Sequence, residues 1–189
     1  MRAMLSLTCL IAVIGVSPAF AGGGFSMTAP GGAITDNDIS FFPLMFDEEQ
    51  QSLSGLQVQV EIRGLTHERP GDLNIFLVDP FGASVELMDD NGDGFAVSDI
   101  DLLFNDVAAS QLPGDAQLNS GTYLPNNGSF SVFDNTGTDA WLLVVLDDAE
   151  MGTGTFREFE ISAVPEPMTL SLLGVGGLAL LRRKRQAAQ

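Results

Sequence analysis

The strongest constraint on the fold is the alternation of apolar and polar residues within residues 54–63. The apolar set is Leu56, Val58, Val60 and Ile62, and the polar set is Gln57, Gln59, Glu61 and Arg63. Successive side chains of a β-strand point to opposite faces, so a period of two places each set on its own face. The stretch therefore predicts a half-buried strand, whose apolar face needs a second layer to cover it.

Further strand patterns follow, separated by turn residues. Residues 39–46 predict an edge strand bent at Pro43, and residues 73–78 predict a hairpin onto 83–88 through the turn Asp79-Pro80-Phe81-Gly82. Residues 129–133 follow a turn, and residues 140–146 are apolar on both faces, which favours a central strand of the core. Residues 155–163 alternate again. No stretch before the tail has helical periodicity, so we expect an all-β, antiparallel, jelly-roll-like β-sandwich.

The N-terminus has the pattern of a secretory signal peptide over residues 1–21. Arg2 precedes an apolar core at residues 5–16, and Ala19-Phe20-Ala21 predicts cleavage between Ala21 and Gly22. Export by the Sec pathway follows. The only cysteine, Cys9, lies inside this peptide, so the exported part has no disulfide and no thiolate site. Residues 22–32 are rich in glycine, and we expect a flexible segment there.

The C-terminal residues 164–189 combine three parts in a fixed order. Val164-Pro165-Glu166-Pro167 is followed by an uncharged apolar run, residues 168–181, and then by the basic stop Arg182, Arg183, Lys184 and Arg185. A helix of this run would span only ~21 Å, against a hydrocarbon core of ~30 Å. We therefore expect transient insertion into the inner membrane through residues 168–181, with a permanent anchor as the alternative.

This tail closely resembles the PEP-CTERM sorting signal, in its proline triplet, its short apolar helix and its arginine cluster. The resemblance implies that an exosortase, a membrane enzyme, recognises the triplet and removes the tail. It also implies a final location on the cell surface or in the extracellular matrix of a Gram-negative-type bacterium.

Charge excludes one class of partner. Residues 22–165 contain 24 acidic residues against Arg63, Arg69 and Arg157, a net charge near −21. Such a domain repels phosphate backbones and anionic lipid, so we expect no nucleic-acid partner. Divalent cations, cationic surfaces and neutral glycans remain open, as does a role in solubility alone.

One acidic loop has the beginning of a calcium-binding pattern. Asp89, Asn91 and Asp93 stand at alternate positions, and Gly94 follows. The remainder of an EF-hand is absent, so Asp99, Asp101 or Asp106 would have to supply further oxygen ligands. The sequence thus leaves two alternatives open, a Ca²⁺ site and a solvated acidic turn, and it predicts no other cofactor.

Residues 33–163 resemble the P domain (P/Homo B domain) of subtilisin-like proprotein convertases. The resemblance rests on Thr66-His67, on residues 71–73 and 77–82, on residues 121–125, and on the strand around Trp141. It implies a β-sandwich that stabilises and regulates a protease and is not itself catalytic. It also implies a structural role for His67, the only histidine.

Two non-enzymatic functions follow from these features. The first is an exported surface or matrix protein, processed by an exosortase and associated with exopolysaccharide. The alternative is an accessory module for a secreted subtilisin-like serine protease. We expect no catalytic residues.

Overall fold

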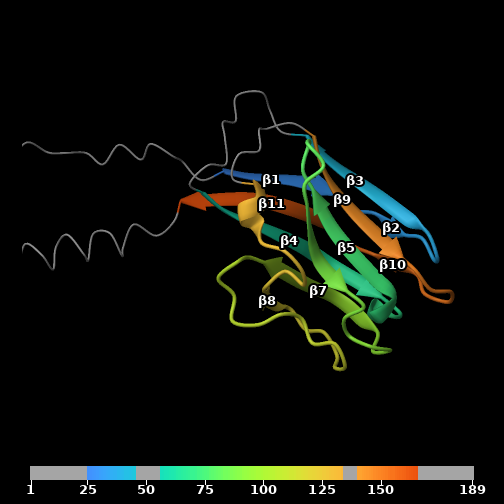
Figure 1. The fold of residues 1–189 in the computed structure, drawn as a ribbon. Coiled ribbons are helices and arrows are strands. Elements are labelled where there is room, and N and C mark those ends of the chain that lie inside the picture. The colour runs from blue at the N-terminus through green and yellow to red at the C-terminus, as the bar shows by residue number, and fades with distance from the viewer. Residues whose placement is uncertain (1–24, 46–55, 134–139, 166–189) are drawn as a thin grey trace, which may run out of the picture.

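The computed structural model describes residues 25–45, 56–133 and 140–165, which form two β-sheets packed face to face (Figure 1). Sheet A contains β1 (Phe25–Pro30), β2 (Ala33–Ile34), β4 (Leu56–His67), β7 (Val97–Phe104), β8 (Gly121–Tyr123), β10 (Gly154–Thr155) and β11 (Glu158–Pro165). Sheet B contains β3 (Ile39–Met45), β5 (Leu73–Val78), β6 (Ser84–Asp89) and β9 (Ala140–Asp147). Two short 3₁₀ turns, η1 (Pro70–Asp72) and η2 (Phe130–Phe133), complete the set.

The long strand β4 is the centre of sheet A. It pairs with β11 and the short β10 along one edge and with β7 along the other, and β1 extends the sheet beyond β11. Sheet B has the order β3-β9-β5-β6. All strand pairs of the described residues are antiparallel except β7 with β8. This confirms the predicted antiparallel β-sandwich.

The core lies between the sheets, where alternate residues of each strand are buried. Val60 and Ile62 of β4 and Phe159 of β11 come from sheet A, and Leu77 and Leu143 come from sheet B. Each such side chain stabilises the fold by about 1.5–3 kcal/mol relative to an exposed one. Val58, Val60 and Ile62 of the apolar set predicted for β4 are thus buried between the sheets.

Several local predictions can now be compared with the structure. The turn after β5 forms as expected, because Asp79 accepts hydrogen bonds from the backbone N–H groups of Phe81 and Ala83 at 2.9 and 2.7 Å. β3 is an edge strand and β9 is central in sheet B, also as expected. Only one face of β9 is buried, however; its other face points away from sheet A.

Two segments differ from the sequence predictions. Residues 130–133 form the 3₁₀ turn η2 instead of a strand, with Phe130 and Phe133 buried; Phe133 packs edge-on against Trp141 at 4.8 Å between ring centroids. Within the glycine-rich segment 22–32, residues 25–30 form β1, paired with β11 from Phe25 to Pro30. The side chain of Ala29 is buried there, so strand pairing and burial hold a segment that composition alone marks as flexible.

Among the described residues, no helix is both long enough and apolar enough to span a bilayer. The predicted signal peptide, its cleavage site at Ala21 and Gly22, and the apolar run 168–181 lie outside those residues.

Candidate functional site

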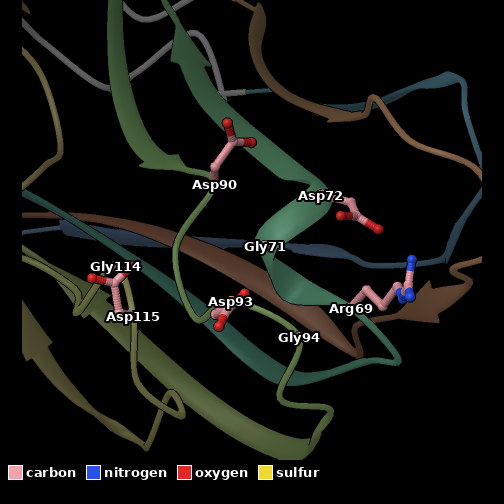
Figure 2. A pocket seen from close by; sticks show the side chains of 8 residues that line it. All are labelled: Arg69, Gly71, Asp72, Asp90, Asp93, Gly94, Gly114 and Asp115. Atoms are coloured by element: carbon pink, nitrogen blue, oxygen red, sulfur yellow. The ribbon is translucent and has the colours of Figure 1, made fainter.

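An acidic hollow lies beside η1, at the start of β5 and the end of β6. A pocket of about 320 Å³ opens there, and we call it the acidic pocket. It is lined by Arg69, Gly71, Asp72, Asp90, Asp93, Gly94, Gly114 and Asp115 (Figure 2). Four of these eight residues are aspartates, so the pocket favours cationic ligands.

Backbone contacts build the walls of the acidic pocket. The N–H of Gly71 donates to the carbonyl of Asp93 at 3.2 Å, and the N–H of Gly92 lies 3.0 Å from the carbonyls of Pro113 and Gly114. A Cβ at position 71 would lie 2.7 Å from that same carbonyl oxygen of Asp93, so only glycine permits this approach. The loop after β6 is therefore fixed against η1 and against the segment around residue 114.

Asp90 is the electrostatically perturbed group of the acidic pocket. Burial raises its pKa, and the neighbouring Asp148 and Asp89 raise it further, whereas a hydrogen bond from Asn74 lowers it. The four carboxylates do not converge, since those of Asp90 and Asp93 point in different directions from the same loop (Figure 2). The pocket therefore concentrates negative potential without forming a single coordination centre.

Asp89 and Asn91, the first two predicted calcium ligands, are hydrogen-bonded to each other in the turn at the end of β6. The N–H of Asp89 donates to Oδ1 of Asn91 at 3.0 Å, and the side chain of Asn91 is buried. The carboxylate of Asp89 accepts from Asn74 at 2.9 Å and from Asn126 at 3.2 Å. Asp93, the third predicted ligand, is an exposed residue that lines the acidic pocket.

Asp99 and Asp101 are placed on β7 in sheet A, beside Arg157. Oδ1 of Asp101 accepts from the N–H of Gly64 at 2.8 Å and from Arg157 at 3.3 Å, and Asp99 lies 3.5 Å from the same guanidinium. Gly64 has a φ of 68° and interrupts the register between β4 and β7, which frees the N–H that Asp101 binds.

The remaining candidate, Asp106, accepts hydrogen bonds from Ser129 and from the N–H of Phe130. Within residues 25–45, 56–133 and 140–165, no three His, Cys, Asp or Glu side chains are placed to hold one metal ion. Calcium binding therefore stays a prediction.

His67 forms a fully buried pair with Asp147, which joins the last residue of β4 to the last residue of β9. Nε2 of His67 lies 3.1 Å from Oδ2 of Asp147, and Nδ1 accepts from the N–H of Arg69 at 3.1 Å. The proton is therefore on Nε2 and is donated to Asp147. Burial raises the pKa of Asp147, while hydrogen bonds from the N–H groups of Ala149 and Asn37 and the neighbouring His67 lower it.

Glycines close the space around the imidazole of His67. A Cβ at Gly154 would lie 2.1 Å from Cδ2 of His67, and one at Gly152 would lie 3.1 Å from Cε1. Because both ring nitrogens are engaged and the ring is sealed, neither nitrogen can take a proton from a substrate. The pair cross-links the two sheets, and sequence reasoning missed Asp147 because it lies 80 residues from His67.

The predicted sorting motif begins inside sheet A. Val164 and Pro165 are the last residues of β11, and their backbones pair with Gln57 and Leu56 of β4. Glu166, Pro167 and the basic stop, Arg182, Arg183, Lys184 and Arg185, lie outside the described residues.

One comparison with known proteins concerns the C-terminal part of the chain. The family model of the PEP-CTERM protein-sorting motif matches residues 163–186. The comparison with curated proteins returned no match.

Two solved structures are similar to this chain at a low level. A serine protease of Aeromonas sobria in complex with the chaperone ORF2 has a TM-score of 0.40 and 15% identity, over 73% of this chain and 26% of that chain. A further structure of the Aeromonas sobria serine protease has a TM-score of 0.40 and 13% identity, over 75% and 27%. This chain thus spans about a quarter of the length of either one.

The family model of the proprotein convertase P-domain matches residues 54–163, which include β4 and most of β11. That range is more than half of the 189 residues and contains most of the sandwich. The chain therefore belongs to the proprotein convertase P-domain family.

Proposed function

We propose that this chain is an exported, non-catalytic protein of the cell surface or extracellular matrix, delivered by its tail and released by an exosortase. The observation that carries the proposal is the PEP-CTERM match at residues 163–186, directly after the P-domain match at 54–163. One module is a sorting signal and the other is an accessory domain, and neither family is catalytic.

The chemistry of the sandwich supports a non-enzymatic function. His67, the only histidine of the sequence, is buried and has both ring nitrogens engaged in hydrogen bonds. In the acidic pocket the carboxylates of Asp90 and Asp93 point in different directions (Figure 2), whereas hydrolysis by two carboxylates requires a pair that flanks the substrate. What remains is a strongly acidic scaffold suited to binding, with exopolysaccharide as the proposed partner.

Processing is tested by the intact mass of the exported protein from a host that encodes an exosortase. We expect a chain that begins at Gly22 and lacks residues 168–185. Glu166→Ala should leave those residues in place, whereas Glu150→Ala, a matched change in an exposed loop, should be processed normally. A surface-located wild-type protein that retains residues 168–185 would contradict the proposal.

The exopolysaccharide partner is tested separately by co-sedimentation with purified polymer from the same cells. An unrelated domain of similar size and charge is the control. Equal retention of the two proteins would remove this partner and leave the processing proposal intact.

A second candidate function is favoured by membership in the P-domain family. The sandwich would bind a separately encoded secreted subtilisin-like protease and stabilise it. Co-expression with such a protease tests this function: a rise in the thermal stability of the protease in the presence of this chain supports it, and no change removes it.

A further inference from the structure

The outward face of sheet B is apolar across three adjacent strands. On β3 the outward residues are Ile39, Phe41, Pro43 and Met45; on β9 they are Ala140, Leu142, Val144 and Leu146; and on β5 they are Asn74, Phe76 and Val78. All of them except Asn74 are apolar, and we call these ten apolar residues the apolar face. An antiparallel sheet with one face in solvent normally has polar residues there, so this face departs from the usual pattern.

Strand register makes the apolar face continuous. Phe41 lies opposite Val144, and Val144 lies opposite Phe76, so the three side chains form one row across the sheet. Pro43, Leu142 and Val78 form the adjacent row. Figure 1 shows β3, β9 and β5 side by side.

The exposure of the apolar face is substantial at its edge. Phe41 is 59% exposed and Met45 is 65% exposed, while the outward residues of β9 and β5 other than Ala140 are half-buried by their neighbours. From strand spacing and residue rise, the face covers roughly 300–400 Å². Single apolar patches of this size on a monomer are often functional.

The apolar face contains no charged residue, although the domain has a net charge near −21. Acidic groups begin on the next strand, β6, where Glu86 lies opposite Phe76. Two of the three arginines, Arg63 and Arg157, are paired with acidic residues of sheet A, and the third, Arg69, lines the acidic pocket. Two copies can therefore meet at this face without burying a charge, whereas the acidic surfaces described above repel each other.

We infer that the apolar face is the interface of a homodimer, in which sheet B of one copy packs on sheet B of a second copy. A two-fold axis through the row of Phe41, Val144 and Phe76 would place the same apolar rows against one another. The face supplies about half of the ~800 Å² that each partner of a standard interface buries, so the dimer belongs to the small, weak interfaces that exchange with the monomer. The inference does not depend on the sorting tail or on the polysaccharide partner.

The test is sedimentation equilibrium of the mature exported protein over a concentration series in 20 mM and 300 mM NaCl. We expect a monomer–dimer equilibrium in which added salt lowers the dissociation constant, because salt screens the repulsion between the copies and leaves the apolar contact intact. A monomer at every concentration would overturn the inference. So would a dimer that weakens as salt rises, because that indicates contacts between opposite charges.

Two variants locate the contact. Phe41→Ser and Val144→Thr should each raise the dissociation constant about tenfold or more, as expected for residues near the centre of an interface. Phe95→Ser removes a phenylalanine of similar exposure, 49%, from the loop that leads into sheet A, and it should leave the constant unchanged.

Far-UV circular dichroism confirms that each variant is folded. Val144→Thr keeps a β-branched residue on the central strand, so its result can be interpreted even if Phe41→Ser disturbs β3. A wild-type dissociation constant in Val144→Thr would overturn the placement of the interface.

Discussion

The two outward faces of the sandwich use the same strand geometry for opposite surface chemistry. On sheet A, Arg63 donates to Glu61, Glu158 and Glu160 at 2.5–2.9 Å, and Ser26 of β1 donates to Glu160 as well. On sheet B the corresponding rows hold phenylalanine, valine, leucine and proline. The hydrogen bonds to Glu158, Glu61 and Glu160 raise the pKa of Arg63, so the cation is firmly held. The charged groups of the polar face are therefore paired within one chain, whereas Phe41 and Met45 on the apolar face are exposed in the part of the chain that the structure describes.

The largest effect is expected where the two sheets are joined. His67→Ala leaves the buried carboxylate of Asp147 without its side-chain partner, so we expect a loss of about 3–5 kcal/mol in the free energy of unfolding. Urea denaturation of the mature protein measures it. The double variant His67→Ala/Asp147→Ala should lose less than the sum of the single variants, because the two residues are coupled. A loss below about 1 kcal/mol for His67→Ala would show that the pair does not hold the sheets together.

The contrast between the inner and outer faces of sheet B is tested on one strand. Leu143→Ala creates a cavity in the core and should cost about 2–5 kcal/mol. Its neighbour Leu142 lies on the apolar face and is only half-buried, so Leu142→Ala should cost less than about 1.5 kcal/mol in dilute protein. Equal losses at micromolar concentration would mean that the outward face is covered within a single chain.

The ion-pair network of sheet A is tested by removing its cation. Arg63→Met leaves Glu61 and Glu160 directly opposite each other on β4 and β11, and we expect a loss of about 1–2 kcal/mol at low salt. The loss should shrink in 1 M NaCl. Arg157→Met is the matched control, since that side chain is 61% exposed and its loss should stay within about 0.5 kcal/mol.

The contributions of Glu86 in sheet B and Glu160 in sheet A to the free energy of unfolding should change with pH in opposite directions. Burial and Asp89 raise the pKa of Glu86 beside the apolar face, while hydrogen bonds from Ser26 and Arg63 outweigh burial and lower the pKa of Glu160. Because the pKa of Glu86 is raised, its carboxyl group binds a proton more tightly in the folded state than in the unfolded state. Its effect is therefore a gain in stability as pH falls from neutral toward the ordinary value of 4.5.

For Glu160 the sign is reversed, so its contribution is complete above pH 4.5 and is lost as pH falls through the lowered pKa. At pH 7 we expect Glu86→Gln to raise the free energy of unfolding and Glu160→Gln to lower it, each by up to about 1 kcal/mol. Urea denaturation between pH 3 and 8 measures both. Changes of the same sign at pH 7 would contradict the assignment.

The smallest effect is expected from calcium at the acidic pocket. At a free concentration equal to its dissociation constant, one bound ion stabilises the folded state by only about 0.4 kcal/mol. Thermal unfolding in calcium and in EDTA measures the shift, and Asp93→Asn should reduce it while Asp99→Asn, at Arg157, should not. Identical melting temperatures in the two buffers would contradict the prediction that the folded protein binds calcium.

Local periodicity was sufficient for most of the fold. The alternation of β4 and the turn chemistry at Asp79 act over a few residues, so both were predicted correctly. η2 was missed because its buried phenylalanines have no clear period, and β1 was missed because pairing with β11, more than 120 residues away, stabilises it.

The candidate site was harder to predict because the pairing of the strands determines which of the predicted ligands lie close together. Asp99 follows Asp89 by ten residues, yet β7 places it in the other sheet, beside Arg157. The apolar face did leave a signal in the sequence, since residues 140–146 are apolar at every position. The pattern of one strand cannot tell whether its second face meets the same chain or another copy.

The end of β11 has a mechanical consequence. Its final residues, Val164 and Pro165, pair with β4, and the strand lies between β4 and β1 for most of its length. A pull on the tail therefore runs along the strand and loads both hydrogen-bond ladders in shear, so that many bonds share the force at once. A force on the tail would therefore act on a strand that is paired on both sides, and the sandwich would resist unfolding from that end.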